Sequence, residues 1–96
     1  MKKLLRLYVV GKTMSAAEAL ESIQSHLADP ALENWELEVV DVLEQPQLAE
    51  EDRIIAVPAL IRKLPPPMRR LVGDLTNREQ LLLGLDILNR EQETRE

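Results

Sequence analysis

Few residues in this chain have side chains suited to catalysis or metal binding. The 96 residues include no cysteine, which excludes disulfides, thiol redox chemistry and thiolate metal ligands. His26 is the single histidine, and it falls late in a predicted helix without an identifiable serine or carboxylate partner, so we interpret it as an ordinary helical residue. The three glycines are far apart, which excludes a glycine-rich phosphate-binding loop.

The remaining polar candidates have structural explanations. Ser15 is followed three residues later by Glu18, the spacing of a capping box in which each side chain satisfies a free backbone amide of the first helical turn. The run Glu50-Glu51-Asp52 holds three carboxylates, but adjacent residues on a helix point in different directions. We therefore predict no catalytic residue, no metal site and no cofactor.

Composition narrows the class of protein further. Seventeen acidic and twelve basic residues give a net charge of −5, which disfavours general nucleic-acid binding. Trp35 and Tyr8 are the only aromatic residues, so the core must be aliphatic. No apolar run is long enough for a membrane span, and Arg6 interrupts an N-terminal stretch that otherwise begins like a signal peptide. We expect one cytoplasmic domain over residues 1–96.

Basic residues are concentrated in one part of the chain. Residues 53–73 contain no carboxylate, while the flanking segments are acidic. Such a strip on an acidic protein can be a docking surface for an acidic partner, or simply a solvated face that offsets nearby acids. Its basic residues are Arg53, Arg62, Lys63, Arg69 and Arg70.

The hydrophobic pattern predicts seven elements. Residues 4–10 are predicted to form a buried strand, and the apolar residues from Ser15 to before Pro30 have the spacing of a helix. Residues 35–40 alternate between apolar and charged, as in a half-buried strand. The residues on its buried side are Trp35, Leu37 and Val39. In the second half we predict a short helix over 46–52, strands over 59–61 and 68–72, a helix from a capping box at 76–79 through Leu88, and a frayed polar tail over 89–96.

The resulting order, β-α-β-α-β-β-α, is that of an α/β protein with the thioredoxin-like arrangement, a small mixed sheet covered by helices. In that fold a cis proline commonly opens the third strand, and Pro58 lies at the expected place. The redox Cys-x-x-Cys motif would stand at the start of the first helix, where this chain reads Gly11-Lys12-Thr13-Met14-Ser15. The residues thus describe a non-catalytic module.

Several segments together resemble the KaiB family of circadian clock proteins. The resemblance covers nearly the whole chain, and its most specific parts are Pro-Gln-Leu-Ala-Glu-Glu-Asp at 46–52 and the stretch from the triproline to Asn-Arg-Glu, 65–79. The matching segments are 7–11, 39–43, 45–52, 56–60, 64–70, 73–79 and 83–86.

The resemblance implies a binding protein without catalytic activity. KaiB proteins bind the ring-shaped ATPase KaiC, help to sequester KaiA in cyanobacteria, and compete with a histidine kinase whose N-terminal domain resembles them. The family is known for two folds. A ground state, usually tetrameric, has the order β-α-β-β-α-α-β, and a rarer monomeric state is thioredoxin-like and binds KaiC. We therefore expect a homo-tetramer or dimer in isolation.

The resemblance also implies which residues bind the partner. Arg53, Arg69 and Arg70 match basic positions of the family and are expected to contact an acidic surface of KaiC. Glu18 departs from the pattern, because relatives often carry a basic residue there that is associated with KaiC binding.

Residues 54–96 are expected to adopt the two folds. Pro58 and the run Pro65, Pro66 and Pro67 can isomerise slowly, which would make the exchange slow. Gly84 lowers helix propensity, and Asp86 is unfavourable near a helix C-terminus. We expect both to tilt the balance away from the thioredoxin-like state.

Three alternatives stay open at this point. The chain could be a sensor-like domain related to the N-terminal domain of a clock histidine kinase, although the triproline and Asn-Arg-Glu segments favour KaiB. It could serve KaiC-linked stress adaptation outside a true clock. The least favoured alternative is a thioredoxin-superfamily enzyme, such as a transferase that uses a serine or tyrosine near the first helix.

Overall fold

The computed structural model describes residues 2–73 and 75–87, and it confirms the predicted order of elements. The predicted frayed tail and Leu88 lie outside the described residues. The elements are β1 (Leu4–Val9), α1 (Met14–His26), the 3-10 turn η1 (Pro30–Leu32), β2 (Glu36–Asp41), α2 (Pro46–Glu51), β3 (Ala59–Leu64), β4 (Arg69–Val72) and α3 (Arg78–Gly84).

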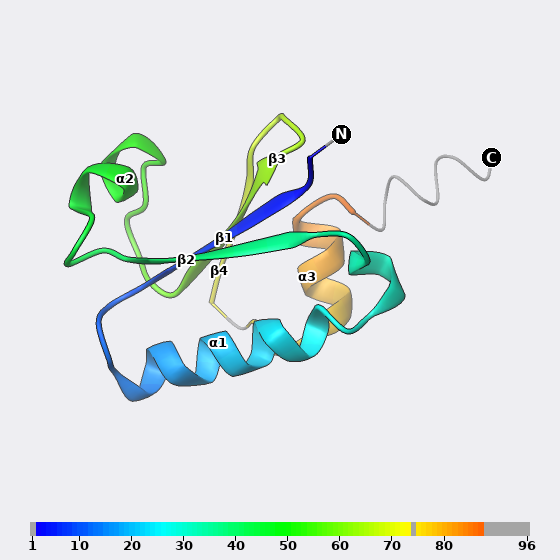
Figure 1. The fold of residues 1–96 in the computed structure, drawn as a ribbon, viewed down its shortest axis with the longest axis horizontal. Helices are drawn as coiled ribbons and strands as arrows, with labels where there is room; N and C mark the ends of the chain where they lie inside the picture. The colour runs from blue at the N-terminus through cyan, green and yellow to red at the C-terminus, as the bar shows by residue number, and fades with distance from the viewer. Residues whose placement is uncertain (1, 74, 88–96) are drawn as a thin grey trace.

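The four strands form one mixed sheet in the order β2-β1-β3-β4 (Figure 1). β1 pairs with β2 in parallel, with α1 as the crossover between them, and with β3 in antiparallel fashion. β4 then pairs antiparallel with β3 and forms the second edge. The carboxyl ends of β1 and β2 and the start of β3 therefore meet at one end of the sheet.

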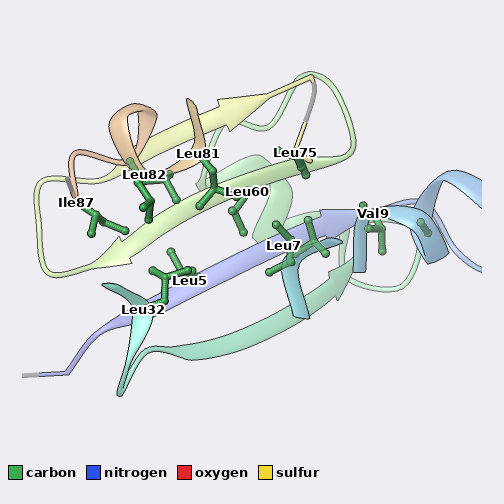
Figure 2. Close-up of a cluster of buried hydrophobic side chains, with 13 residues drawn as sticks. Leu5, Leu7, Val9, Leu32, Leu60, Leu75, Leu81, Leu82 and Ile87 are labelled. Carbon is green, nitrogen blue, oxygen red and sulfur yellow. The ribbon is translucent and has the colours of Figure 1, made fainter. Parts of the chain in front are cut away.

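The two faces of the sheet are covered differently. α1 and α3 cover one face with an aliphatic core, and Figure 2 shows leucines of β1, β3 and α3 meeting there. On the other face Tyr8, Val40, Ala59 and Ile61 pack beneath α2 and its flanking loops. This division follows from strand geometry, since successive side chains point to opposite faces.

The helix caps differ from both predicted capping boxes. Thr13 caps α1, and its hydroxyl accepts a hydrogen bond from the Ala16 amide at 3.0 Å, so Ser15 lies within the first turn. Asn77, rather than Thr76, caps α3 by accepting from the Gln80 amide at 2.9 Å. In each case two cap-forming residues lie close together. Asparagine is the stronger cap of the second pair, and Thr13 directly follows the turn at 11–12.

Two further expectations can be compared directly. The Val57–Pro58 peptide bond is cis, as predicted. The predicted buried side of the second strand is wrong at Val39, which is 45 % exposed, while Val40 is buried on the opposite face. β2 is an edge strand, so it has a neighbouring strand on one side only. Among the described residues, no helix has the length and apolar character needed to cross a membrane.

Candidate interaction surface

Two of the predicted partner-binding residues come together on the face that carries α2. Arg53 follows Asp52, the C-terminal cap of α2, and has a positive φ of 56°, and Arg70 lies on β4 opposite Ile61. The Arg70 guanidinium donates through Nη1 to the Arg53 carbonyl oxygen at 3.1 Å. Both residues are exposed, and we call them the Arg53–Arg70 pair.

Arg69 lies on the opposite face of the same strand. It is the neighbour of Arg70 on β4, and adjacent residues of a strand point to opposite faces. Its guanidinium lies 3.8 Å from the Asp86 carboxylate, just beyond α3. The structure thus divides the three predicted binding arginines into a pair and a separate residue.

The other two basic residues of the acid-free segment are not part of an exposed strip. Arg62 is only 1 % exposed, and it donates to the Pro67 carbonyl at 2.7 Å and to the Asp86 carbonyl at 3.5 Å. Lys63 is half-buried, with Nζ 2.5 Å from the Asp52 carboxylate. Both lie on β3, a central strand, which explains why the charge pattern alone misplaced them.

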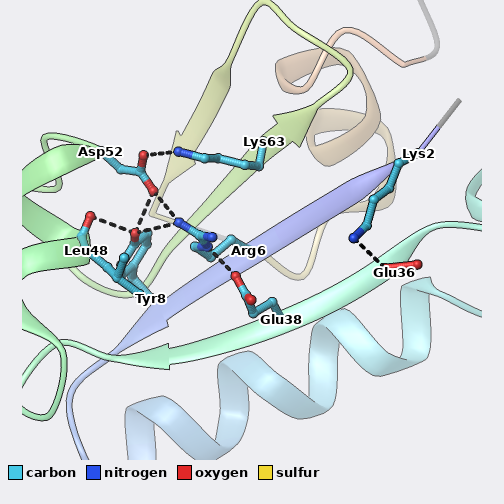
Figure 3. A network of polar contacts seen from close by, with 8 residues as sticks. All are labelled: Lys2, Arg6, Tyr8, Glu36, Glu38, Leu48, Asp52 and Lys63. Carbon is cyan, nitrogen blue, oxygen red and sulfur yellow. Dashed lines mark hydrogen bonds and ion pairs between the residues drawn. The ribbon is translucent and has the colours of Figure 1, made fainter.

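A network of polar side chains connects α2 with the sheet (Figure 3). Asp52, which is buried, accepts from Arg6 Nη1 at 2.9 Å and from Lys63 Nζ at 2.5 Å, and its Oδ2 lies 2.5 Å from the Tyr8 hydroxyl. Arg6 also donates to Glu38 at 2.5 Å. The sequence analysis treated Asp52 only as part of an acidic run without a metal site and missed this role, because its partners on β1 are 44 and 46 residues away.

The network shifts the ionisation of several of its members, among them Asp52 and Tyr8. Burial by itself would raise the pKa of Asp52, but hydrogen bonds from Lys63 and Tyr8 and the nearby Lys63 charge lower that pKa below its ordinary value. Burial and the hydrogen bond with Asp52 raise the pKa of Tyr8 to about 12. The Asp52 carboxylate is thus ionised and the Tyr8 phenol neutral at physiological pH. In these states Asp52 accepts hydrogen bonds from Arg6 and Lys63, and Tyr8 adds no second negative charge beside it.

Pro58 borders two shallow hollows at the start of α1, each of about 230 Å³. Ser15 lines both, and Glu18 lines one of them. The hollows thus present hydroxyl and carboxylate groups where a redox enzyme would have its thiols.

In the part of the chain that the structure describes, His26 and the acidic residues form no evident catalytic or metal site. The Nε2 atom of His26, at the far end of α1, contacts the Leu75 carbonyl oxygen at 3.2 Å. Within residues 2–73 and 75–87 no three metal-ligating side chains gather into a cluster.

Of the predicted fold-switch residues, Pro58 directly precedes β3, and the others lie around α3 and in the connection before β4. Pro65, Pro66 and Pro67 form the connection between β3 and β4. A Cβ on Gly84 would lie 3.2 Å from Leu71 Cδ1, so the helix approaches β4 closely at this residue. Asp86 follows the helix with a positive φ of 61°, whereas the sequence predicted it within the helix; the left-handed turn after Leu85 ends the helix first.

The arrangement of sheet and helices defines a thioredoxin-like domain, and comparison with solved structures agrees. The mitochondrial thioredoxin 3 of Saccharomyces cerevisiae superposes with a TM-score of 0.70 at 17 % identity, over 88 % of this chain and 77 % of that one. The N-terminal domain of Synechococcus elongatus SasA superposes with a TM-score of 0.73 at 30 % identity, over 90 % of this chain and 85 % of that one.

The chain belongs to the KaiB family. The KaiB domain model matches residues 6–87. The circadian clock oscillator protein KaiB of a Synechococcus strain is 50 % identical over 92 % of this chain and 80 % of its own length. The corresponding protein of Rippkaea orientalis is 48 % identical over 96 % of this chain and 88 % of its own. The family resemblance and the thioredoxin-like fold predicted from the sequence are both confirmed.

Proposed function

We propose that this protein is a non-catalytic clock or timing protein that binds the ATPase ring KaiC and modulates its phosphorylation and ATPase cycle. Family membership supports this function, and the exposed Arg53–Arg70 pair is the observation in the structure that carries it. The pair occupies two of the three positions at which the family resemblance places basic contacts to KaiC.

The geometry of the pair suits an acidic docking surface. The hydrogen bond from Arg70 to the Arg53 carbonyl restricts the Arg70 side chain before binding, so less conformational freedom is lost on association. The protein has a net charge of −5, so attraction to an acidic partner depends on this local concentration of positive charge. Arg69 faces Asp86 instead, and we expect it to contribute less.

The similarity to the SasA domain favours a second, related role. Proteins that share a fold can share a binding surface, so we propose that this chain competes with a clock histidine kinase for KaiC. KaiA is a further candidate partner by family resemblance. The same KaiC-binding activity would serve a KaiC-linked stress response in a cell without a full clock.

We also propose that the described thioredoxin-like fold is the state that binds KaiC. The second fold, β-α-β-β-α-α-β, would then be the state that forms homo-oligomers. Residues 54–96 would exchange between the two folds. The close approach of α3 to Leu71 at Gly84 and the contact between Asp86 and Arg69 would help to set the stability of the thioredoxin-like fold.

Binding to KaiC encoded by the same genome tests the proposal. Wild-type protein, Arg70→Glu and Arg69→Glu are compared at moderate salt by surface plasmon resonance, with circular dichroism to verify each fold. Arg70→Glu replaces an attraction with a like-charge contact, so its Kd should rise at least about ten-fold, and Arg69→Glu should change it less. The KaiC ATPase rate, measured with and without the wild-type protein, should change.

Three results would count against the proposal or its proposed binding surface. Wild-type protein that neither binds KaiC nor alters its ATPase rate would remove the proposed function. Equal binding by Arg70→Glu and wild type would mean that the basic pair is only a solvated surface. Turnover of a thiol substrate by the same preparation would instead favour a thioredoxin-superfamily enzyme.

A further inference from the structure

Three large apolar side chains are exposed at one end of the sheet. Met14 is 77 % exposed, Leu43 71 % and Ile55 96 %. Met14 begins α1 shortly after β1, Leu43 follows β2, and Ile55 precedes β3. Because β1 and β2 are parallel and β3 is antiparallel to β1, these segments lie at the same end, on the left in Figure 1. We call Met14, Leu43 and Ile55 the apolar end.

The backbone at this end is held in place although the side chains are exposed. Asp41 Oδ1 accepts hydrogen bonds from the Gly11 amide at 3.0 Å and from the Leu43 amide at 2.9 Å. A Cβ on Gly11 would lie 3.8 Å from Leu43 Cδ1, so the Leu43 side chain lies beside the turn after β1. An exposed apolar side chain on a fixed loop needs little ordering to bind a partner.

Positive charge adjoins two of the three apolar residues. Lys12 precedes Met14 by two residues, and Arg53 precedes Ile55 by two and is bonded to Arg70. Glu44 adjoins Leu43, so the far side of the apolar end carries a negative charge. β2 and β3 are two strand spacings apart, about 10 Å. The segments that carry Leu43 and Ile55 therefore leave the sheet close enough together for one partner to contact both. Apolar centres with charged rims are typical of interface hot spots.

We propose that the apolar end, with Ile55 as its anchor, inserts into an apolar pocket of KaiC that is bordered by carboxylates. The inference rests on the proposed function, and it extends the Arg53–Arg70 pair into a two-part docking surface. Ile55 and its neighbours leave water on binding, while Arg53 and Arg70 meet the carboxylates.

Substitution of Ile55 tests the inference without disturbing the core, because this side chain is almost wholly exposed. Ile55→Ala and Ile55→Glu are compared with wild type for binding to KaiC. Ile55→Ala should raise Kd by about three- to ten-fold, and Ile55→Glu by more, since a carboxylate would then face an apolar pocket with an acidic border. Val39→Ala is the matched control, because Val39 is also exposed but lies on β2, before the segment proposed to exchange between folds, and the Kd of this variant should stay within about two-fold of wild type.

The outcomes separate the inference from the proposed function. If Arg70→Glu loses binding while both Ile55 variants bind like wild type, the inference is wrong and the proposed function stands. If wild type does not bind KaiC, both fail. If Ile55→Glu converts an oligomer to a monomer in light scattering while its KaiC affinity is unchanged, the apolar end is covered by a second copy of the chain, and the inference is overturned.

Discussion

At the scale of single residues, Asp52 shows how a buried charge is accommodated in this small protein. A carboxylate that leaves water is stable only when donors replace the lost hydration. Here the donors come from two strands, with Arg6 and Tyr8 on β1 and Lys63 on β3. The carboxylate follows α2 directly, so these bonds hold the end of that helix against the sheet.

The raised pKa of Tyr8 predicts a loss of stability in alkali. Between the ordinary value of 10 and the folded value of about 12, the unfolded chain binds fewer protons than the folded one, so stability falls as pH rises. The two-unit difference corresponds to about 2–3 kcal/mol, which is fully present below pH 10 and lost by pH 12.

Urea unfolding of wild type and Tyr8→Phe across pH 8–12 measures this effect. At pH 8 the variant should be less stable by about 1–2 kcal/mol, because it lacks the hydrogen bond to Asp52. The difference should shrink as pH rises, since only wild type titrates the phenol. Parallel curves for the two proteins would refute this role of Tyr8.

At the scale of elements, the start of α1 permits a matched pair of cap substitutions. Thr13→Ala removes the side-chain acceptor for the Ala16 amide and should destabilise the protein by about 1 kcal/mol. Ser15→Ala should be neutral or slightly stabilising, because Ser15 lies within the helix, where alanine is preferred. Thermal or urea unfolding measures the stability of the two variants. A larger loss of stability in Ser15→Ala than in Thr13→Ala would mean that Ser15 is the cap.

The end of α3 is where we expect the balance between the two folds to be set. Gly84→Ala gains about 1 kcal/mol of helix propensity, part of which is offset because the new Cβ would lie 3.2 Å from Leu71. Asp86→Arg removes a negative charge next to the helix C-terminus. Part of this gain is offset, because the half-exposed pair with Arg69 becomes a like-charge contact and because aspartate suits the positive φ of this residue better than arginine does.

Together the substitutions should increase the thioredoxin-like population by about three- to ten-fold and speed KaiC binding accordingly. NMR spectra of the double variant, and of Asp86→Arg alone, measure the two populations and separate the contribution of each residue. Spectra and binding rates equal to those of wild type would show that these residues do not set the balance.

At the scale of the whole molecule, small size favours association. A 96-residue domain buries only about 60–65 % of the surface that its unfolded chain exposes, so contacts between copies can add stability. We predict a dimer or tetramer for the isolated protein, measured by light scattering across micromolar concentrations. A concentration-independent monomer would contradict this prediction, and it would mean that the described thioredoxin-like state predominates.

Much of the fold could be predicted from local patterns. The element order, the aliphatic core, the short helix beginning at Pro46 and the cis peptide at Pro58 all follow from spacing and residue type within a few positions. The predicted N-terminal caps are one or two residues away from the observed ones, because neighbouring serine, threonine and asparagine side chains can all cap the start of a helix. The binding roles of Arg53, Arg69 and Arg70 stay predictions.

The sequence by itself determined the class of the protein, its family and the absence of cysteine, because these depend on which residues are present and in what order. Only the tertiary structure decided which charges are available to a partner. Arg62 and Lys63 are turned inward because β3 is central, and Arg69 and Arg70 are separated because adjacent residues of a strand face opposite ways. These outcomes depend on the position of a strand in the sheet and on contacts between distant residues, which a local pattern does not contain.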